Sequence, residues 1–238
     1  MSLSPLAVDI ETVGRRWEEL DEGVQKYLMN RGNKKKSREE VIKKLPLNPG
    51  TGRIIAIGMW RPEEEKGGVL LEKSENQNQG EAGTIDKWEE LTENSMIYRG
   101  DESQLLSEFW RYISQGVSRL ITYNGRSFDG PFLMLRSAIL GIEPSRSFSP
   151  YRYSFNRHCD LAEVVSFFGA RDMESLDFWC RQAGIDSPKE DMDGSEVGEA
   201  YKKGRIEEIG KYCLRDAEGT AKLFNALKPV IEIMEKEL

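Results

Sequence analysis

Two carboxylates stand at the end of the first apolar segment of the sequence. Asp9 and Glu11 follow Leu6–Val8, a run that predicts a buried strand. Alternate residues of a strand point to the same face of a sheet, so these two carboxylates are expected to lie side by side. Carboxylate oxygens are the ligands that hard divalent cations prefer. The D-x-E pattern recurs at Asp172/Glu174 and Asp216/Glu218, where no buried strand precedes it, and a solvated acidic surface is the alternative for any one pair.

Two further acids stand out by their position in the sequence. Asp129 follows the turn Asn124-Gly125 at the predicted start of a helix, where turn and N-cap duty is the alternative for Asn124 and Asp129. Asp216 lies four residues after Tyr212 on a predicted late helix, so these two side chains share one helical face. A plain helix-surface pair is the alternative there.

The elements that would position these acids form an α/β pattern, with strands first and helices later. Apolar runs predict strands at 6–11, 52–60, 68–72, 95–98 and 119–123. Asp101 is the expected N-cap of a helix, and residues 128–140 form another helix with Phe132, Leu135 and Ile139 on its inner stripe. Later helices are predicted at 160–168, 175–183, 195–203 and 206–227. One domain over 1–238 is expected, with residues 13–50 as an N-terminal helical insertion (helices near 17–29 and 37–45).

Composition excludes several classes of protein and site. The chain has 238 residues and a net charge of -7, so any contact with nucleic acid must rest on a local basic patch. The single histidine, His158, excludes multi-histidine zinc sites, and three widely spaced cysteines argue against a disulfide framework. No apolar run is long enough for a membrane span, and the first ten residues do not predict a secretory signal. We therefore expect a cytoplasmic protein that does not contact a membrane.

The ordered combination of these motifs resembles DEDD-type exonucleases in their tyrosine variant. Three segments sharpen this resemblance, namely Arg157–Leu161, Asp193–Val197 and Tyr212–Thr220. They are similar to the predicted 3′–5′ exonucleases related to the proofreading domain of family B DNA polymerases. The similarity covers nearly the whole chain outside residues 13–50. It implies a ribonuclease H-like fold, with a central mixed sheet flanked by helices. It also implies removal of nucleotides from the 3′ end of a single strand with two divalent metal ions, Mg²⁺ or Mn²⁺.

The resemblance also implies a role for each motif residue. Asp9 would bridge both metal ions, Glu11 and Asp216 would hold the ion that orients the attacking water, and Asp129 would hold the second ion, partly through water. Tyr212 would hydrogen-bond that water rather than act as a base, because a tyrosine pKa lies near 10. Four acids balance two divalent ions, whereas without metal they would repel one another and raise each other's pKa.

Candidate contacts with the substrate fall in two groups. Ile10 and Thr12 would adjoin a 3′-terminal nucleotide by the resemblance, and Phe128 would either wall the terminal base or pack inward. Residues 146–158 alternate arginine with aromatic rings, which suits a single strand, and rings that pack into the core are the equal alternative. The candidates are Ile10, Thr12, Asn124, Phe128, Arg152, Tyr153, His158 and Asp160. His158 is otherwise a structural ring. The basic stretch 31–44 is a second candidate surface for the strand, with a solvated linker as the favoured interpretation.

Three hypotheses for function follow. An active exonuclease on single-stranded ends is favoured, with DNA preferred over RNA. A non-catalytic nucleic-acid-binding module on the same fold is the alternative, and the presence of all five motif residues argues against it. A metal-dependent phosphatase on another α/β fold would want D-x-D after the first strand, where this chain has Asp9-Ile10-Glu11.

Overall fold

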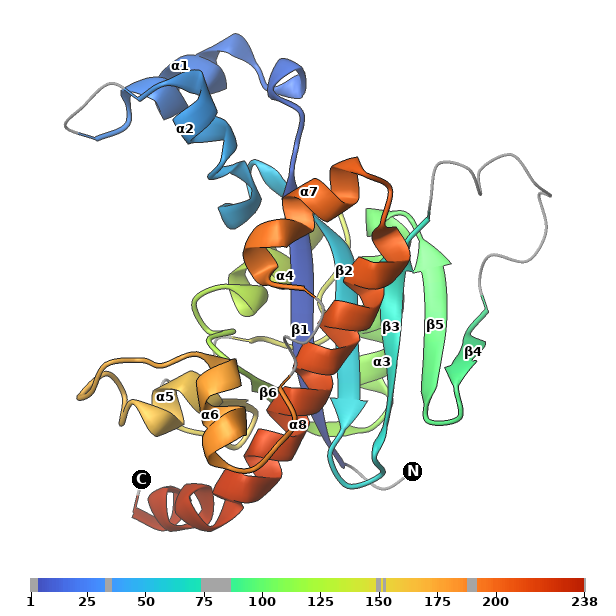
Figure 1. The fold of residues 1–238 in the computed structure, drawn as a ribbon, viewed down its shortest axis with the longest axis vertical. Helices are drawn as coiled ribbons and strands as arrows, with labels where there is room; N and C mark the ends of the chain where they lie inside the picture. The colour runs from blue at the N-terminus through green and yellow to red at the C-terminus, as the bar shows by residue number, and fades with distance from the viewer. Residues whose placement is uncertain are drawn as a thin grey trace.

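A seven-stranded mixed sheet forms the centre of the computed structural model, which describes residues 4–32, 36–73, 87–148, 151, 153–187 and 192–237. The strands are β1 (Ser4–Gly14), β2 (Gly52–Arg61), β3 (Lys66–Glu72), β4 (Glu89–Thr92), β5 (Ser95–Gly100), β6 (Val117–Thr122) and β7 (His158–Asp160). Their order across the sheet is β4-β5-β3-β2-β1-β6-β7. β1 lies antiparallel to β2 and parallel to β6, so the first strand is central (Figure 1).

Helices cover both faces of this sheet. They are α1 (Glu22–Asn30), α2 (Arg38–Ile42), α3 (Glu102–Ser114), α4 (Asp129–Ile139), α5 (Leu161–Val165), α6 (Leu176–Gln182), α7 (Val197–Lys202) and α8 (Ile206–Glu237). One core cluster joins one face of the sheet to α5, α6, α7 and α8, and a second joins the other face to α3 and α4. Figure 1 shows α8 crossing in front of the sheet with α3 behind it.

The alternation along β1 decides which face its acids occupy. Leu6, Val8 and Ile10 belong to the cluster shared with α3, whereas Ala7 and Val13 belong to the cluster shared with α8. Asp9 and Glu11 occupy the same odd-numbered positions as Ala7 and Val13, so their side chains lie on the α8 side, as side-chain alternation requires. The expectation that both acids share one face agrees with this placement.

Residues 15–51 fold outside the sheet between β1 and β2. Two short 3₁₀ helices, η1 (Trp17–Glu19) and η2 (Leu45–Leu47), flank α1 and α2. A small separate core of Trp17, Leu20, Val41 and Leu45 holds the segment together. Its two ends meet because Gly14 and Gly52 are partners in the β1–β2 register.

Several expected elements differ from the observed ones. Leu135 and Ile139 of α4 are 51% and 58% exposed, because Phe132 and Leu133 face the core instead. The short strands β4 and β7 were not expected, and α8 continues past Pro229 to Glu237, where buried Ile231 packs against the main core. Residues 74–83, whose polar, low-complexity sequence predicts a loop, lie outside the described residues. Within the described ranges, no helix combines the length and apolar character needed to cross a membrane.

Candidate metal centre

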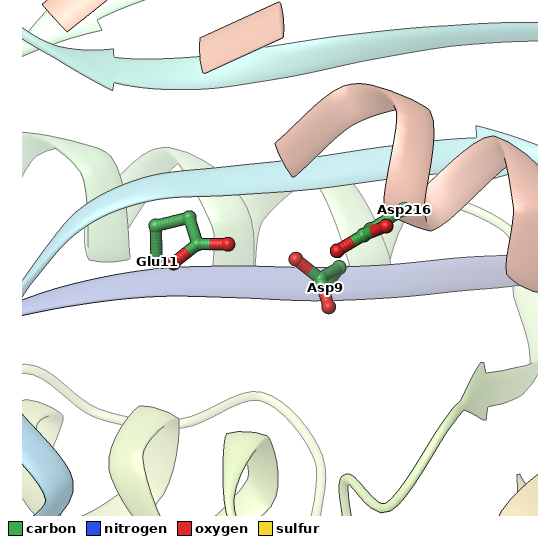
Figure 2. Close-up of side chains that lie close together, drawn as sticks. All are labelled: Asp9, Glu11 and Asp216. Atoms are coloured by element: carbon green, nitrogen blue, oxygen red, sulfur yellow. The ribbon is translucent and has the colours of Figure 1, made fainter. Parts of the chain in front are cut away.

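Three of the predicted acids meet between β1 and α8. Asp9 and Glu11 project from β1 toward Asp216 of α8, as Figure 2 shows. One carboxylate oxygen from each residue lies within 4.8 Å of the other two. Residues from opposite ends of the sequence therefore form a single group of carboxylate oxygens, and the spacing of these oxygens suits a bound cation.

A close approach of α8 to the sheet produces this meeting. Gly58 is the partner of Asp9 in the β1–β2 register, and a β-carbon at position 58 would overlap the backbone of Cys213 on α8. The Gly58 amide donates to Cys213 Sγ at 3.1 Å, and the Cys213 thiol donates to the Asp9 carbonyl oxygen at 3.5 Å. Asp216, one helical turn after Cys213, is thereby held over β1.

Asp129 adds a fourth carboxylate from the start of α4. Its side chain is only 5% exposed and accepts a hydrogen bond from the backbone of Ile10, the residue between the two acids of β1. Burial is the main cause that raises the Asp129 pKa to about 7, and the charges of Asp160 and Asp216 raise it further. The charge of Asp129 in turn raises the pKa of Asp9 and of Glu11, so Asp129 belongs electrostatically to the same group.

The chemistry of this group fits hard divalent cations. Burial, followed by repulsion from neighbouring carboxylates, raises the pKa of Asp9 and of Glu11 well above the ordinary range. Asp9 Oδ2 is buried and has no hydrogen-bond partner among the described residues. Because an unpartnered buried carboxylate oxygen is costly, a cation at this position would satisfy the oxygen and offset the repulsion.

Tyr212 lies beside these acids on the same face of α8. It is 4% exposed and hydrogen-bonds Asp216. Burial raises its pKa above the ordinary tyrosine value, and the charges of Asp216 and Glu11 raise it further. The phenol therefore stays protonated at neutral pH and can position a hydrogen-bonded group, but it cannot serve as a base.

A loop that was not among the predicted site residues also borders the acids. The charge of Asp193, the N-cap of η4 (Gly194–Glu196), contributes to the raised pKa of Glu11. A β-carbon at Gly194 would lie 3.6 Å from Tyr212 Oη. The sequence carried a local signal for this loop, because Asp193 and Glu196 form a capping box. That pattern indicates where a helix begins, but it does not indicate which residues the loop contacts in the fold.

Asp160 and Asn124 build the turn that leads to Asp129. Asp160 accepts hydrogen bonds from the backbone amides of Asn124 and Arg126, both at 2.8 Å, and caps α5 through the amide of Ala162. Asn124 adopts a φ of 64°, a conformation that asparagine tolerates better than most residues. These two candidates therefore shape the approach to α4.

His158 is fully buried, and both of its ring nitrogens contact the protein. Nε2 lies 2.8 Å from Thr122 Oγ1, and Nδ1 lies 2.8 Å from the Phe148 carbonyl oxygen. Burial is the main cause that lowers the His158 pKa to about 4, and the charge of Arg126 lowers it further. The ring therefore has no free nitrogen for a substrate, which matches the structural alternative.

The candidates around β1 occupy mixed environments. Ile10 is 4% exposed and faces the α3 side of the sheet. Thr12 Oγ1 donates to the Pro46 carbonyl oxygen at 2.8 Å. Phe128 is half-buried and packs on Phe132 with 5.0 Å between ring centroids. Phe128 thus both packs and keeps an exposed part next to Asp129.

The aromatic stretch at 146–158 is divided between core and surface. Phe148 and Phe155 are buried, whereas Tyr153 is 42% exposed and lies 5.6 Å from the Tyr151 ring. Arg152 lies outside the described residues. The tyrosines line a small cavity of about 140 Å³ together with Glu235. Glu235 follows Asp216 by nineteen residues, about 28 Å along a helix axis, so Tyr153 is not brought to the acids.

Comparisons with known proteins place this fold and sequence in a defined context. The family model described as "Predicted 3′-5′ exonuclease related to the exonuclease domain of PolB" matches residues 53–235, a range that holds Asp129, Tyr212 and Asp216. An uncharacterized protein of Methanocaldococcus jannaschii is 32% identical over 191 residues, which cover 76% of this chain and 89% of that protein. A DNA polymerase of Pyrococcus glycovorans is 24% identical over 227 residues, covering 87% of this chain.

The fold has a counterpart among solved structures. The family B DNA polymerase of Pyrobaculum calidifontis matches 99% of this chain with a TM-score of 0.61 and 16% identity. This chain spans 27% of the length of that polymerase and 27% of the Pyrococcus polymerase. The predicted ribonuclease H-like fold, a mixed sheet flanked by helices, is confirmed.

Proposed function

The chain belongs to the family of predicted 3′–5′ exonucleases related to the exonuclease domain of PolB, and from that premise we propose that it is an active exonuclease. It hydrolyses phosphodiester bonds at the free 3′ end of single-stranded nucleic acid, with DNA favoured over RNA. The whole chain serves as one exonuclease domain. The three free, buried cysteines support a reducing, cytoplasmic location.

The observation that carries the proposal is the convergence of Asp9, Glu11 and Asp216, with Asp9 Oδ2 buried and unpartnered among the described residues. A surface patch of acids would stay solvated and would not raise its own pKa values in this way. Asp129, whose charge acts on the same group, brings the number of carboxylates to four. Four negative charges match two divalent ions, the pair used in two-metal phosphodiester hydrolysis.

Each acid then has a defined part. Asp9, Glu11, Asp129 and Asp216 would hold Mg²⁺ or Mn²⁺. When bound, two such ions neutralise charge on the phosphate and lower the pKa of water. Tyr212, held protonated by its surroundings and hydrogen-bonded to Asp216, would orient the attacking water through its hydroxyl group. We expect this positioning to contribute less than the carboxylates do.

The residues around the acids would shape the end of the strand. Ile10 and Thr12 flank Glu11 in the chain, Phe128 directly precedes Asp129, and Asn124 begins the turn that leads to Asp129. These residues would border the terminal nucleotide. Asp160 and His158 would act indirectly: Asp160 accepts hydrogen bonds from backbone amides of the turn that leads to Asp129, and His158 contacts the Thr122 side chain just before that turn. Tyr153 would meet only a longer strand.

Digestion of end-labelled single strands tests the proposal. Wild-type protein with Mg²⁺ or Mn²⁺ should shorten a strand with a free 3′ end and spare one with a blocked 3′ end. EDTA or the substitution Asp9→Ala should abolish the reaction. The four carboxylates of Asp9, Glu11, Asp129 and Asp216 are here called the acidic group. The matched control is Asp172→Ala/Glu174→Ala, which removes an exposed D-x-E pair outside this group and should leave the rate unchanged.

Each alternative has its own signature in this assay. Cleavage that survives EDTA and Asp9→Ala would refute the metal mechanism, and shortening from the 5′ end would refute the polarity. Retained binding without cleavage under every metal condition would favour the non-catalytic binding module. Parallel digestion of DNA and RNA strands of one sequence measures the preference for DNA.

A further inference from the structure

Positive charge in this acidic protein is concentrated in one segment. Residues 15–50, here called the basic arm, contain ten lysines and arginines against six aspartates and glutamates, although the whole chain has a net charge of -7. The remainder of the chain is therefore more acidic than the total suggests. A polyanion approaching the protein would be attracted mainly by the basic arm.

The basic arm begins and ends beside β1, the β-strand that carries Asp9 and Glu11. Gly14, which ends β1, is three residues from Glu11, about 10 Å at the rise of a strand. The hydrogen bond from Thr12 to Pro46 joins η2 to the residue that follows Glu11. Lys43 and Lys44, at the end of α2, precede Pro46 by only three and two positions. Figure 1 shows the arm extending from the end of β1 near α7.

Among the described residues, two of the arm's acids form ion pairs with its arginines, and two lysines next to the sheet form none. Glu18 forms an ion pair with Arg38, and Glu19 forms ion pairs with Arg15 and Arg16. In the described part of the chain, neither Lys43 nor Lys44 forms an ion pair, and both are exposed. An unpaired lysine can exchange its counterions for a phosphate without first breaking a contact within the protein.

An exposed tyrosine and an exposed leucine accompany these charges. Tyr27 of α1 is 62% exposed and Leu47 of η2 is 63% exposed, although both belong to a segment with its own small core. Surfaces that bind single strands combine cations with exposed rings on which bases stack. A solvated linker needs neither an organised core nor a fixed position beside Thr12.

We propose that the basic arm binds the phosphate backbone of the single strand whose 3′ end reaches the acidic group, with Lys43 and Lys44 as the contacts nearest to it. This inference rests on the proposed function for the position of the 3′ end. For the stretch 31–44, of which residues 33–35 lie outside the described structure, it favours the strand-binding alternative over the solvated linker. Strands long enough to reach the arm gain affinity, whereas a dinucleotide does not.

Equilibrium binding in EDTA tests the arm without requiring catalysis. The probe is a fluorescent 20-nucleotide oligothymidylate, measured by anisotropy at salt concentrations from about 50 to 200 mM. We expect Lys43→Glu/Lys44→Glu to weaken binding about tenfold or more at the lowest salt concentration, and to reduce the slope of log affinity against log salt by about 1.4, since each phosphate contact on a single strand contributes about 0.7. The charge-matched control is Lys228→Glu/Lys236→Glu, on exposed lysines near the end of α8.

Two outcomes would overturn this inference: equal losses in the arm variant and the control, or no measurable binding by wild-type protein at the lowest salt concentration. Hydrolysis of a thymidine dinucleotide with Mn²⁺ separates the inference from the proposed function. The arm variant should cleave the dinucleotide at the wild-type rate while its KM for the 20-nucleotide strand rises. If neither protein cleaves any substrate, the proposed function fails, and the binding comparison still decides the role of the arm.

Discussion

Gly58 of β2 and Cys213 of α8 meet backbone to backbone, with the Gly58 amide 3.1 Å from Cys213 Sγ. A β-carbon on Gly58 would lie 2.8 Å from the Cys213 carbonyl carbon, closer than side chains pack in proteins. Because Gly58 is also the β-sheet partner of Asp9, this contact sets the distance between the acids of β1 and Asp216. The spacing of the proposed metal ligands thus depends on a residue that has no side chain.

Gly58→Ala should damage both stability and the metal site. The added methyl group forces α8 away from the sheet, so we expect the free energy of unfolding to fall by about 1–3 kcal/mol. The rise in Tm on adding Mn²⁺ should shrink as Asp216 moves from Asp9. Gly198→Ala is the control, since a β-carbon there meets nothing within 4 Å and alanine favours helix α7. Thermal unfolding with and without Mn²⁺ measures both effects, and an unchanged Mn²⁺ response would contradict this account.

Asp9→Asn should have opposite effects on stability with and without metal. Burial, and then the charges of Asp216, Asp129 and Glu11, raise the Asp9 pKa, so the ionised carboxylate is disfavoured in the folded protein. In EDTA at pH 8 the substitution removes this penalty. We therefore expect Tm to rise by a few degrees, equivalent to about 1 kcal/mol or more. With saturating Mn²⁺ the wild-type protein should gain more than the variant, because preferential binding to the folded state stabilises it. Asp172→Asn, on the exposed surface, should show neither effect, and curves that keep one order in both buffers would refute the prediction.

Tyr212→Phe should lower the rate of hydrolysis while leaving metal binding intact. The substitution removes only the hydroxyl group that hydrogen-bonds Asp216, and we expect kcat to fall by about 10- to 100-fold. The Mn²⁺-induced rise in Tm should match that of the wild-type protein. Because the Tyr212 pKa is raised, no loss of activity from its ionisation should occur below pH 10. Tyr27→Phe, on the exposed basic arm, is the control for kcat on the dinucleotide.

His158 should make the protein less stable as the pH falls from about 6.5 to 4. The folded protein keeps the ring neutral with a pKa of about 4, whereas the unfolded chain takes up a proton near pH 6.5. The neutral ring therefore contributes about 3 kcal/mol above pH 6.5, and this contribution is lost as the pH decreases through that window. Urea unfolding of wild-type protein and His158→Gln isolates the effect: the stability difference between them should narrow at low pH, and parallel pH profiles would be inconsistent with it.

The sequence predicted the parts of the fold that depend on local patterns. Asp101 caps α3 through a capping box with Gln104, as the position of Asp101 before the apolar helix indicated. The odd-numbered placement of Asp9 and Glu11 follows from strand alternation alone. That Asp216 would meet them came from the resemblance, because no local pattern reports which helix face packs on which strand.

Other features depended on packing across the molecule. In the stripe predicted for α4, Phe132 is buried as expected, but Leu135 and Ile139 face solvent. Leu133 and the buried Arg136 turn inward instead, where Arg136 pairs with Glu102. Hydrophobicity alone cannot reveal that ion pair. The alternation of arginines with aromatics in residues 146–158 likewise could not show that Phe148 would join the core and Tyr153 the surface.

The pairing of Gly14 with Gly52 separates sequence changes within residues 15–51 from changes in the sheet that carries the carboxylates. Since the chain leaves and re-enters the sheet at neighbouring points, insertions or deletions within 15–51 can be absorbed there without altering the register of β1 or the spacing of its carboxylates. On the proposed function, the residues for catalysis and the residues that bind a longer strand thus lie in different stretches of sequence. Homologous chains could exchange one while keeping the other, and a chimaera joined at these two glycines is a natural way to transfer substrate preference.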